Sequence, residues 1–368
     1  LKIIEHISQD LVEGRDYTTS TTQGWIRFSN GSEIISGSWA DKRYLKFRSI
    51  DLSAAIFEEL IENEGDDVEA YKEIKNRVGR LPHIKENFII SCTNPGSPSS
   101  FWYKYFILGQ NELRHVMYSL TTDNPFLPKK YINQLLQDMD PKVARRMLFG
   151  EWLEIAGEVI YYAYSREKNY RDYAYKIDLN HPIHFSYDFN IGEGKPMSVI
   201  FYQIIDDVFH FFEEVVVFSS RTQDTLDEAA GRGLFNHPVP YFCHGDAFGD
   251  NSDTRYNKSD YEIIDKFCQN YEPKLTYKRQ VLKSNPALRT RHNLVNAYCM
   301  NALGQIRFYV YNQAKTLDEG MRLTKLKRGA DYLEDDSKHY QHITTAAGYG
   351  IYYYSLLKDR KPNSTIQL

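Results

Sequence analysis

Two apolar segments that each lead into an aspartate place the strongest constraint on the fold of this chain. Residues 184–189 contain Asp188 near their end, and residues 239–244 lead to Asp246. Short apolar runs separated by charged segments of helical period are typical of strands in an α/β sheet. Carboxylates at the ends of adjacent strands can converge on divalent cations. We therefore predict that both aspartates bind metal, and that the metal is a pair of Mg²⁺ or Mn²⁺ ions. The alternative for either residue is a structural role in capping a turn.

The order of predicted elements in the second half of the chain narrows the fold further. After the Asp188 strand come a long hairpin that turns at Asp206-Asp207, a helix, the Asp246 strand, a second helix and a late helix with an acidic start. This order resembles that of RNase H-like nucleases, and the resemblance implies a central mixed sheet flanked by helices. The predicted ranges are 197–218 for the hairpin and 221–232, 259–270 and 338–358 for the helices.

A third carboxylate is expected near the start of the last helix. Asp335, His339 and His342 are spaced i, i+4 and i+7, which would place them on one helical face. Asp336 is the other candidate. The alternative is a solvated acidic helix start, because carboxylates favour helix N-termini. His342 could instead be a buried histidine with one hydrogen bond.

Composition excludes several classes of protein. The 368 residues are enough for two domains, and the net charge of −4 argues against a surface covered in positive charge, so any nucleic-acid site must be a local patch. The four cysteines form no CxxC pair, which indicates reduced, mostly buried thiols rather than a zinc site or disulfides. No apolar run approaches the roughly 18 residues that span a bilayer, and no membrane partner is expected.

The densest basic stretch of the second half lies between the second and third acidic motifs, interleaved with aromatic residues. Contacts to DNA phosphates need such a patch, and the binding would be salt-dependent and independent of sequence. The alternative is an ordinary exposed basic loop. The predicted DNA-binding residues are Lys195, Lys278, Arg279, Lys283, Arg289 and Arg291.

The first half of the chain also alternates strands with helical segments. Residues 24–37 are predicted to form a hairpin with Asn30-Gly31 at its bend. Buried strands are predicted for residues 53–60, which run into two glutamates, and for residues 86–93. A charged helix is predicted for residues 64–80.

Taken in order, these motifs resemble the large terminase subunit of tailed bacteriophages over almost the whole chain. Each motif is weak alone, and the order and spacing carry the resemblance. The matching segments are Gly150-Glu151-Trp152 with Gly157, Tyr187-Asp188 with Lys195-Pro196, His244-Gly245-Asp246, residues 291–297, residues 304–308, and residues 342–349. The last of these resembles a terminal His-x-x-Asp-Ala-x-x-Tyr motif.

One position departs from that family pattern. Thr345 stands where the family has its third metal-binding aspartate. The resemblance then implies one of two outcomes. Either Asp335 or Asp336 supplies the third carboxylate, with His342 assisting, or metal binding is weakened.

The resemblance extends to the first half. Residues 54–59 resemble a Walker B strand, in which Glu58 would hold Mg²⁺ through water and Glu59 would polarise the attacking water. The segment around Asn94 resembles the family's coupling motif. No GxxxxGK[ST] phosphate loop occurs in this sequence, so the chain itself is expected to bind ATP poorly, and ATP is the cofactor expected of the intact protein.

These observations predict an α/β protein with a partial RecA-like P-loop ATPase domain that lacks the Walker A loop (1–125), a connecting segment (126–178) and an RNase H-like nuclease domain (179–368). The resemblance implies a packaging terminase whose metal-dependent endonuclease cuts concatemeric double-stranded DNA, with the portal protein and the small terminase subunit as partners. It also implies a homo-oligomer on the portal, in the host cytoplasm and transiently on the procapsid. The expected catalytic residues are Asp188, Asp246, Asp336, His342 and Glu59.

Three other functions are compatible with the sequence. The chain could be another RNase H-like nuclease such as a resolvase or a transposase, although the Walker-B-like block and Glu151-Trp152 argue against this. It could be a nuclease-impaired DNA clamp or portal-docking module, because of Thr345. It could also act only as a motor ATPase.

Overall fold

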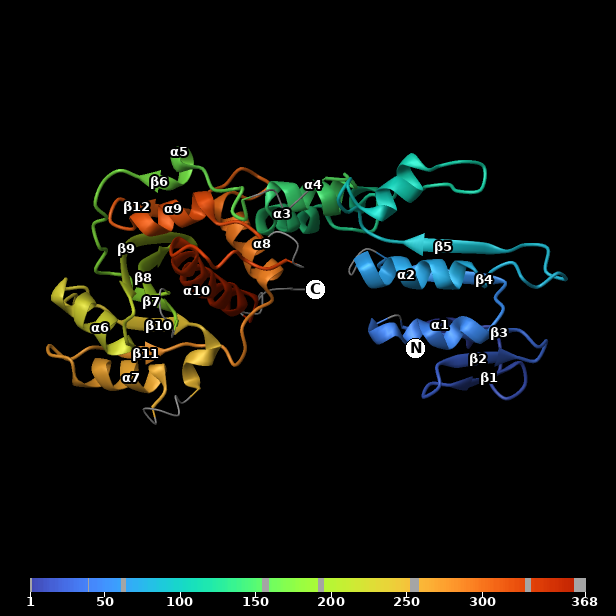
Figure 1. Cartoon of the computed structure of the whole chain (residues 1–368), viewed down its shortest axis with the longest axis horizontal. Helices are drawn as coiled ribbons and strands as arrows, with labels where there is room; N and C mark the ends of the chain where they lie inside the picture. The colour runs from blue at the N-terminus through green and yellow to red at the C-terminus, as the bar shows by residue number, and fades with distance from the viewer. Residues whose placement is uncertain are drawn as a thin grey trace. The chain divides into compact units, whose positions relative to one another are not determined.

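The computed structural model describes residues 2–38, 40–60, 64–153, 159–190, 195–251, 258–327 and 332–360, so Gly157 of the junction motif lies outside the described residues. The chain divides into two compact units, Leu1–Tyr118 and Ser119–Leu368. Strands and helices alternate in both (Figure 1), which confirms the α/β class. None of the described helices is long and apolar enough to cross a membrane.

The first unit contains two small sheets and short helices. Its elements, in chain order, are α1 (Lys2–Ile7), β1 (Tyr17–Ser20), β2 (Trp25–Phe28), β3 (Glu33–Ile35), η1 (Ala40–Ser49), β4 (Ala54–Glu58), α2 (Glu64–Lys75), β5 (Phe88–Cys92) and η2 (Tyr103–Leu108). Strands β1, β2 and β3 form an antiparallel sheet, and β4 pairs with β5 in parallel. The predicted hairpin is confirmed, and Gly31 at its bend has a φ of 86°.

The β4–β5 sheet is covered on one face. Phe57 is buried and its ring packs 5.3 Å from that of Tyr71 on α2. On the other face Ile56, Phe88 and Ile90 are exposed, because no described element covers them. The two strands are therefore confirmed, and the prediction that they are fully buried is wrong for this face.

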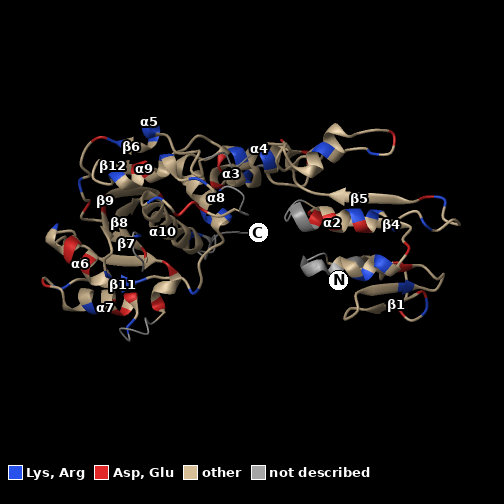
Figure 2. Cartoon of the chain, viewed as in Figure 1, with Lys and Arg blue, Asp and Glu red and all other residues tan. Residues whose placement is uncertain are grey.

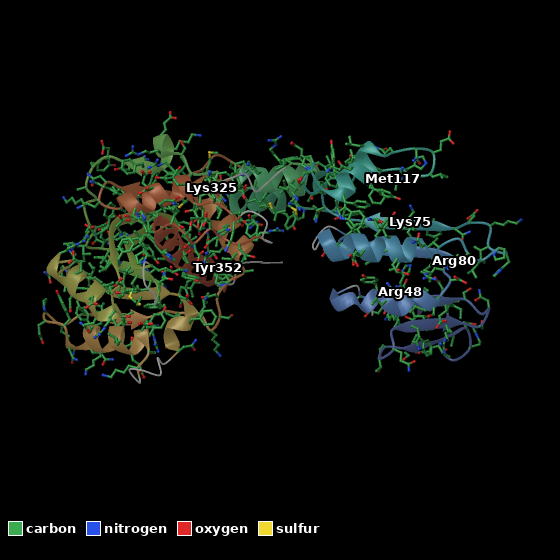
Figure 3. The ribbon with its side chains drawn as sticks, in the orientation of Figure 1. Arg48, Lys75, Arg80, Met117, Lys325 and Tyr352 are labelled. Atoms are coloured by element: carbon green, nitrogen blue, oxygen red, sulfur yellow. The ribbon has the colours of Figure 1, made fainter. Side chains whose placement is uncertain are left out.

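Exposed apolar residues also follow η2 at the end of the first unit. The side chains of Leu113 and Met117, the latter labelled in Figure 3, are more than nine-tenths exposed.

The second unit is built on one seven-stranded sheet. Its elements, in chain order, are η3 (Thr121–Asp123), α3 (Lys129–Asp138), α4 (Pro141–Phe149), α5 (Arg166–Asn169), β6 (Tyr170–Arg171), β7 (Ile183–Asp188), β8 (Pro196–Ile205), β9 (Val208–Phe218), α6 (Thr222–Gly231), β10 (Tyr241–Gly245), η4 (Ala247–Asp250), α7 (Asp260–Asn270), β11 (Tyr277–Arg279), α8 (Leu288–Cys299), β12 (Phe308–Tyr311), α9 (Lys315–Leu323) and α10 (Tyr340–Arg360). Helices α3 and α4, which lie in the predicted connecting segment, belong to this unit.

The sheet is mixed, with the order β11-β10-β7-β8-β9-β12-β6. Strands β7, β8 and β9 are antiparallel neighbours, while β10 runs parallel to both β7 and β11. The predicted turn at Asp206-Asp207 is confirmed. Both residues have positive φ, 51° and 66°, as a two-residue hairpin turn requires.

Two hydrophobic cores lie on the two faces of this sheet. Helices α6 and α7 pack over one face, where Phe185, Tyr187 and Phe201 are buried. Helices α8, α9 and α10 pack over the other (Figure 1), against Tyr202 and Phe211. Side chains alternate along each strand, so β8 and β9 contribute apolar residues to both cores, whereas β7 and β10 contribute them only to the core beneath α6 and α7. Three of the four cysteines are buried and all are free, as expected.

Two features of the structure differ from the sequence-based predictions. The last part of the predicted basic stretch forms the start of helix α8. This part is not an exposed loop, because α8 packs against β12 and α10. Helix α10 begins at Tyr340, so Asp335 and His339 precede it and do not share a helical face with His342.

Helices α9 and α10 approach closely at Gly320. A Cβ at this position would lie 2.4 Å from the backbone oxygen of Tyr340. Because that atom is backbone, Gly320→Ala forces the helices apart, and we expect the free energy of unfolding to fall by about 1–3 kcal/mol. Gly231, at the end of α6, has nothing within 4 Å of its Cβ position. Gly231→Ala should change stability by less than about 1 kcal/mol, in the stabilising direction. Urea unfolding of both variants tests the contact, and equal stabilities would contradict it.

Candidate functional site

Asp188 and Asp246 lie side by side at one edge of the second unit's sheet. Strands β7 and β10 are parallel neighbours in which Tyr187 is paired with Gly245, so Asp188 at the end of β7 and Asp246 just after β10 are the next residues along each strand. The backbone N–H of Asp246 donates to the Tyr187 carbonyl oxygen at 3.2 Å. The sequence-based expectation that the two carboxylates come together from adjacent strands matches this arrangement.

Gly245 makes this approach possible. Its φ of +148° is a conformation that residues with a Cβ rarely adopt. A Cβ here would lie 2.6 Å from the carbonyl oxygen and 2.9 Å from the backbone nitrogen of Tyr187. Any larger residue would therefore push β10 away from β7 one residue before Asp246.

Asp188 is buried and held by two side chains. Its Oδ2 lies 2.9 Å from Asn190 Nδ2, which donates to it, and 2.9 Å from His342 Nδ1 on α10. Burial raises the pKa of the Asp188 carboxyl, and the contacts with His342 and Asn190 oppose that rise. His342 is buried, as one interpretation of the sequence allowed, and it contacts a predicted site residue.

Asp246 is held by a residue that the sequence analysis missed. Its Oδ1 accepts hydrogen bonds from the backbone N–H of Phe248 at 2.8 Å and from Asn285 Nδ2 at 2.7 Å. The Asn285 amide oxygen in turn accepts from the backbone N–H of Ala247. Asn285 lies in the segment before α8, and no local motif marks it, because its role depends on a contact 39 residues away.

A buried charge cluster joins α8 to the segment before α10. Arg291 on α8 donates from Nη2 to Glu334 Oε1 at 2.7 Å, and His292 Nε2 contacts the same oxygen. Burial tends to raise the pKa of Glu334, but the Arg291 charge and the His292 hydrogen bond outweigh it and hold the pKa at about 2. Arg291 is 2% exposed. The prediction that Arg291 binds DNA is therefore wrong, because its guanidinium is enclosed and paired.

Thr345 faces this cluster from α10. Its hydroxyl oxygen lies 3.3 Å from Arg291 Nη2, 3.3 Å from Glu334 Oε2 and 2.9 Å from Gln341 Nε2. Thr345, at the position of the family's aspartate, thus contacts both members of an ion pair.

The structure does not join the two predicted late carboxylates to the aspartate pair. Asp336 Oδ2 accepts a hydrogen bond from Lys195 Nζ at 2.6 Å, and both side chains are about half exposed. Asp335 Oδ1 accepts from the backbone N–H of Ser337 at 3.1 Å. Neither is hydrogen-bonded to Asp188 or Asp246 in the described part of the chain, so their assignment as metal ligands stays a prediction.

The donor set at the strand ends fits a hard divalent cation. One oxygen of Asp188 and one of Asp246 are held by amide donors, while no described residue donates to the second oxygen of either carboxylate. Carboxylate oxygens are the ligands that Mg²⁺ and Mn²⁺ prefer. Across the described ranges no three of the His, Cys, Asp and Glu residues gather as a metal cluster, so two carboxylates are the donors on which this site depends.

The predicted DNA-binding residues divide into exposed cations and cations held in ion pairs. Lys278, Lys283 and Arg289 are exposed. Arg279 donates to Asp250 at 2.7 Å, and Lys195 is paired with Asp336 as described. Figure 2 shows Lys and Arg interspersed with Asp and Glu over both units, in keeping with a local patch rather than a basic surface.

The two predicted acidic residues of the first unit lie at the end of β4, next to the end of β5. Glu58 is paired in register with Cys92, and both Glu58 and Glu59 are exposed. Glu59 has a φ of 54°, which is unusual for a residue other than glycine. Asn94, two residues after β5, is exposed at the same edge. The structure thus brings the predicted nucleotide-binding residues to one sheet edge, and their roles stay predictions.

Comparisons with known proteins confirm the family resemblance. Residues 10–151 match the family model of the phage terminase large subunit. A 150-residue alignment is 29% identical to the PBSX phage terminase large subunit of Bacillus subtilis (strain 168), and it covers 34% of this chain and 33% of that protein. The match therefore spans about one third of the length of that curated relative.

Solved structures extend the likeness to both units. A large terminase from a thermophilic bacteriophage, in complex with ADP, matches with a TM-score of 0.56 at 12% identity, over 95% of this chain and 81% of that one. The complex of the same terminase with ATP-gamma-S gives a TM-score of 0.55 at 13% identity, over 91% and 77%. The fold is that of these large terminases.

The ion pair between Glu334 and Arg291 should make the free energy of unfolding depend on pH in the acidic range. The pKa of Glu334 is lowered from 4.5 to about 2 in the fold, so its contribution is present above pH 4.5 and is lost as the pH falls towards 2. Glu334→Gln leaves Arg291 buried without its partner, and we expect the free energy of unfolding at pH 7 to fall by about 3–5 kcal/mol. Urea unfolding between pH 7 and pH 3 measures both effects.

Glu228→Gln is the matched control, because Glu228 forms an exposed pair with Arg232 at 2.8 Å. It should cost less than about 1 kcal/mol. A loss no larger for Glu334→Gln than for this control would contradict the role of the buried pair.

Proposed function

We propose that this chain carries the endonuclease of a phage packaging terminase, a metal-dependent hydrolase that cuts concatemeric double-stranded DNA at initiation and completion of packaging. The observation that supports this most directly is the pairing of Asp188 with Asp246. The two carboxylates end neighbouring parallel strands that approach within hydrogen-bonding distance at Tyr187 and Gly245. Each carboxylate has one oxygen held by protein donors and a second oxygen left for a cation.

Mg²⁺ or Mn²⁺ held by these carboxylates would supply the positive charge that activates water and stabilises the leaving oxygen of a phosphodiester. The residues around the pair have positioning roles. Asn190 and Asn285 fix the rotation of the two carboxylates. His342 Nδ1 lies 2.9 Å from Asp188 Oδ2, and this contact lowers the pKa of the carboxyl against the effect of burial.

The exposed cations Lys278, Lys283 and Arg289 would contact DNA phosphates without reading sequence. They lie on β11, in the segment after it, and at the start of α8, so they flank Asn285 in the chain. Cleavage would therefore be non-specific, and regulation would come from the access of DNA to the site.

In the intact protein this nuclease would be coupled to an ATP-driven translocase, with Glu58 and Glu59 at the nucleotide. The portal protein and the small terminase subunit are the proposed partners, with a homo-oligomer forming on the portal. The proposed location is the host cytoplasm and, transiently, the procapsid. A nuclease-impaired DNA clamp is the second candidate, because Thr345 faces Arg291 and Glu334 where a third carboxylate was expected.

Substitution of the aspartate pair tests the proposed activity. Asp188→Asn and Asp246→Asn remove one negative charge each and preserve shape, so we expect Mn²⁺- or Mg²⁺-dependent cleavage of supercoiled plasmid to fall at least about 100-fold in either variant. The conversion of supercoiled to nicked and linear DNA is followed on gels. Asp335→Asn and Asp336→Asn in the same assay test the sequence-based prediction of a late metal ligand.

Asp227→Asn on α6 is the control, because Asp227 is exposed on the helix layer opposite α10. Unchanged cleavage in the aspartate-pair variants would refute the metal site. A wild-type chain that binds DNA and never cuts it with either metal would instead support the DNA-clamp function.

The basic segment predicts a measurable salt dependence. Lys278→Ala, Lys283→Ala and Arg289→Ala should each lower the slope of log K against log salt by about 0.9 for duplex DNA, if each cation neutralises one phosphate. Fluorescence anisotropy with a labelled duplex between low and moderate salt gives the slopes. Lys168→Ala on α5, beside the opposite edge of the sheet, should leave the slope unchanged. The same slope in all four variants would rule out this segment as the DNA contact.

A further inference from the structure

Arg291 is a buried cation that the proposed mechanism does not use. From α8 its Nη2 donates to Glu334, in the segment before α10, at 2.7 Å and to Thr345 on α10 at 3.3 Å. Its Nε is enclosed and has no hydrogen-bond partner among the described residues. An arginine that is fully desolvated and incompletely hydrogen-bonded is costly to keep unless its charge has a use.

The helix that faces Arg291 is shaped to admit it. A Cβ on Gly348 would lie 2.9 Å from Arg291 Cδ and 3.1 Å from Cγ. The guanidinium lies over the ring of Tyr349, 4.9 Å from its centre. Only a glycine at 348 lets the aliphatic part of Arg291 cross α10, so the position of the charge is built into the packing of the two helices.

This charge stands beside the aspartate pair. Thr345 follows His342 by three residues on α10, which places both on one face of the helix, and His342 Nδ1 contacts Asp188 at 2.9 Å. Arg291 Nη2 contacts Thr345 at 3.3 Å, so the guanidinium lies against the same face of α10 that carries the contact to Asp188. The guanidinium and the carboxylates therefore belong to one site.

Glu334 is not available as a metal ligand, because both of its oxygens already accept hydrogen bonds. Its Oε1 receives Arg291 and His292, and its Oε2 receives Gln341 and Thr345. Four donors saturate the carboxylate, which leaves no lone pair directed to a further cation. The two-cation arrangement expected from the sequence needs a third ligand beside Thr345, and none of the residues that the structure describes around Thr345 fits that role.

We infer that Arg291 is the fixed positive charge of this site, standing beside Thr345 in place of a second metal ion, so that Asp188 and Asp246 hold one divalent cation. This inference rests on the proposed function and deepens it. Glu334 is the positioning residue that holds the guanidinium at Thr345. A second cation next to Arg291 would meet like charge in a desolvated pocket, which opposes its binding.

Stoichiometry of Mn²⁺ binding to the full chain tests this inference without relying on cleavage. Electron paramagnetic resonance of free Mn²⁺ during titration, repeated by calorimetry, should give one site per chain. That site should disappear in Asp188→Asn and in Asp246→Asn. Two sites in the wild-type chain would overturn the inference and leave the proposed nuclease standing. No site at all would overturn the inference and the proposed metal site together.

Variants at Thr345 separate the charge from the packing. Thr345→Asp alone should still bind one Mn²⁺, because Arg291 pairs with the new carboxylate. Thr345→Asp combined with Arg291→Met and Glu334→Gln removes the buried pair without leaving an unpaired charge, and it should bind a second Mn²⁺. Circular dichroism of each variant confirms that it is folded. A second site in Thr345→Asp alone, at the affinity of the first, would show that Arg291 does not exclude metal.

Discussion

The close approach of β10 to β7 at Gly245 is the constraint on which the site depends. Strand separation within a sheet is fixed by the backbone hydrogen bonds, so side chains at paired positions on parallel neighbours lie at a set spacing. The bond from Asp246 N–H to the Tyr187 carbonyl extends that spacing one residue past the end of β10. Since a Cβ at 245 would collide with Tyr187, the glycine, the carboxylate spacing and the sheet edge form one structural unit.

The part of the site formed by α8 and α10 depends on a different constraint, which is the packing of these helices around the buried ion pair of Arg291 and Glu334. Arg291 and Glu334 are both nearly inaccessible, and burying such a pair costs desolvation that its attraction offsets only in part. Net stability is therefore a poor explanation for the pair. What it provides is position, because Arg291, His292, Gln341 and Thr345 all converge on Glu334 and tie α8 and α10 to the segment before α10.

The elements that were predicted well from the sequence are those whose patterns are local. The Asp206-Asp207 turn and the strands that end at Asp188 and Asp246 follow from residues next to one another in the chain. Burial of β4 and β5 was overstated, because a strand's pattern does not reveal how many faces its neighbours cover. The i, i+4, i+7 spacing from Asp335 presumed a helix that in fact begins at Tyr340. Arg291 was assigned to the surface because its partner, Glu334, lies 43 residues away.

Asn285 links the exposed cations of this negatively charged chain to the aspartate pair, which bears on the proposed binding of DNA. It lies two residues after the exposed Lys283 and four before the exposed Arg289, and it donates to Asp246 at 2.7 Å. The segment whose cations we propose to contact DNA phosphates is therefore hydrogen-bonded directly to one carboxylate of the site. A phosphate bound by this segment would be positioned relative to Asp246 by one hydrogen bond, the one from Asn285 to Asp246. Few exposed cations are then needed, because their placement rather than their number aligns the backbone with the site.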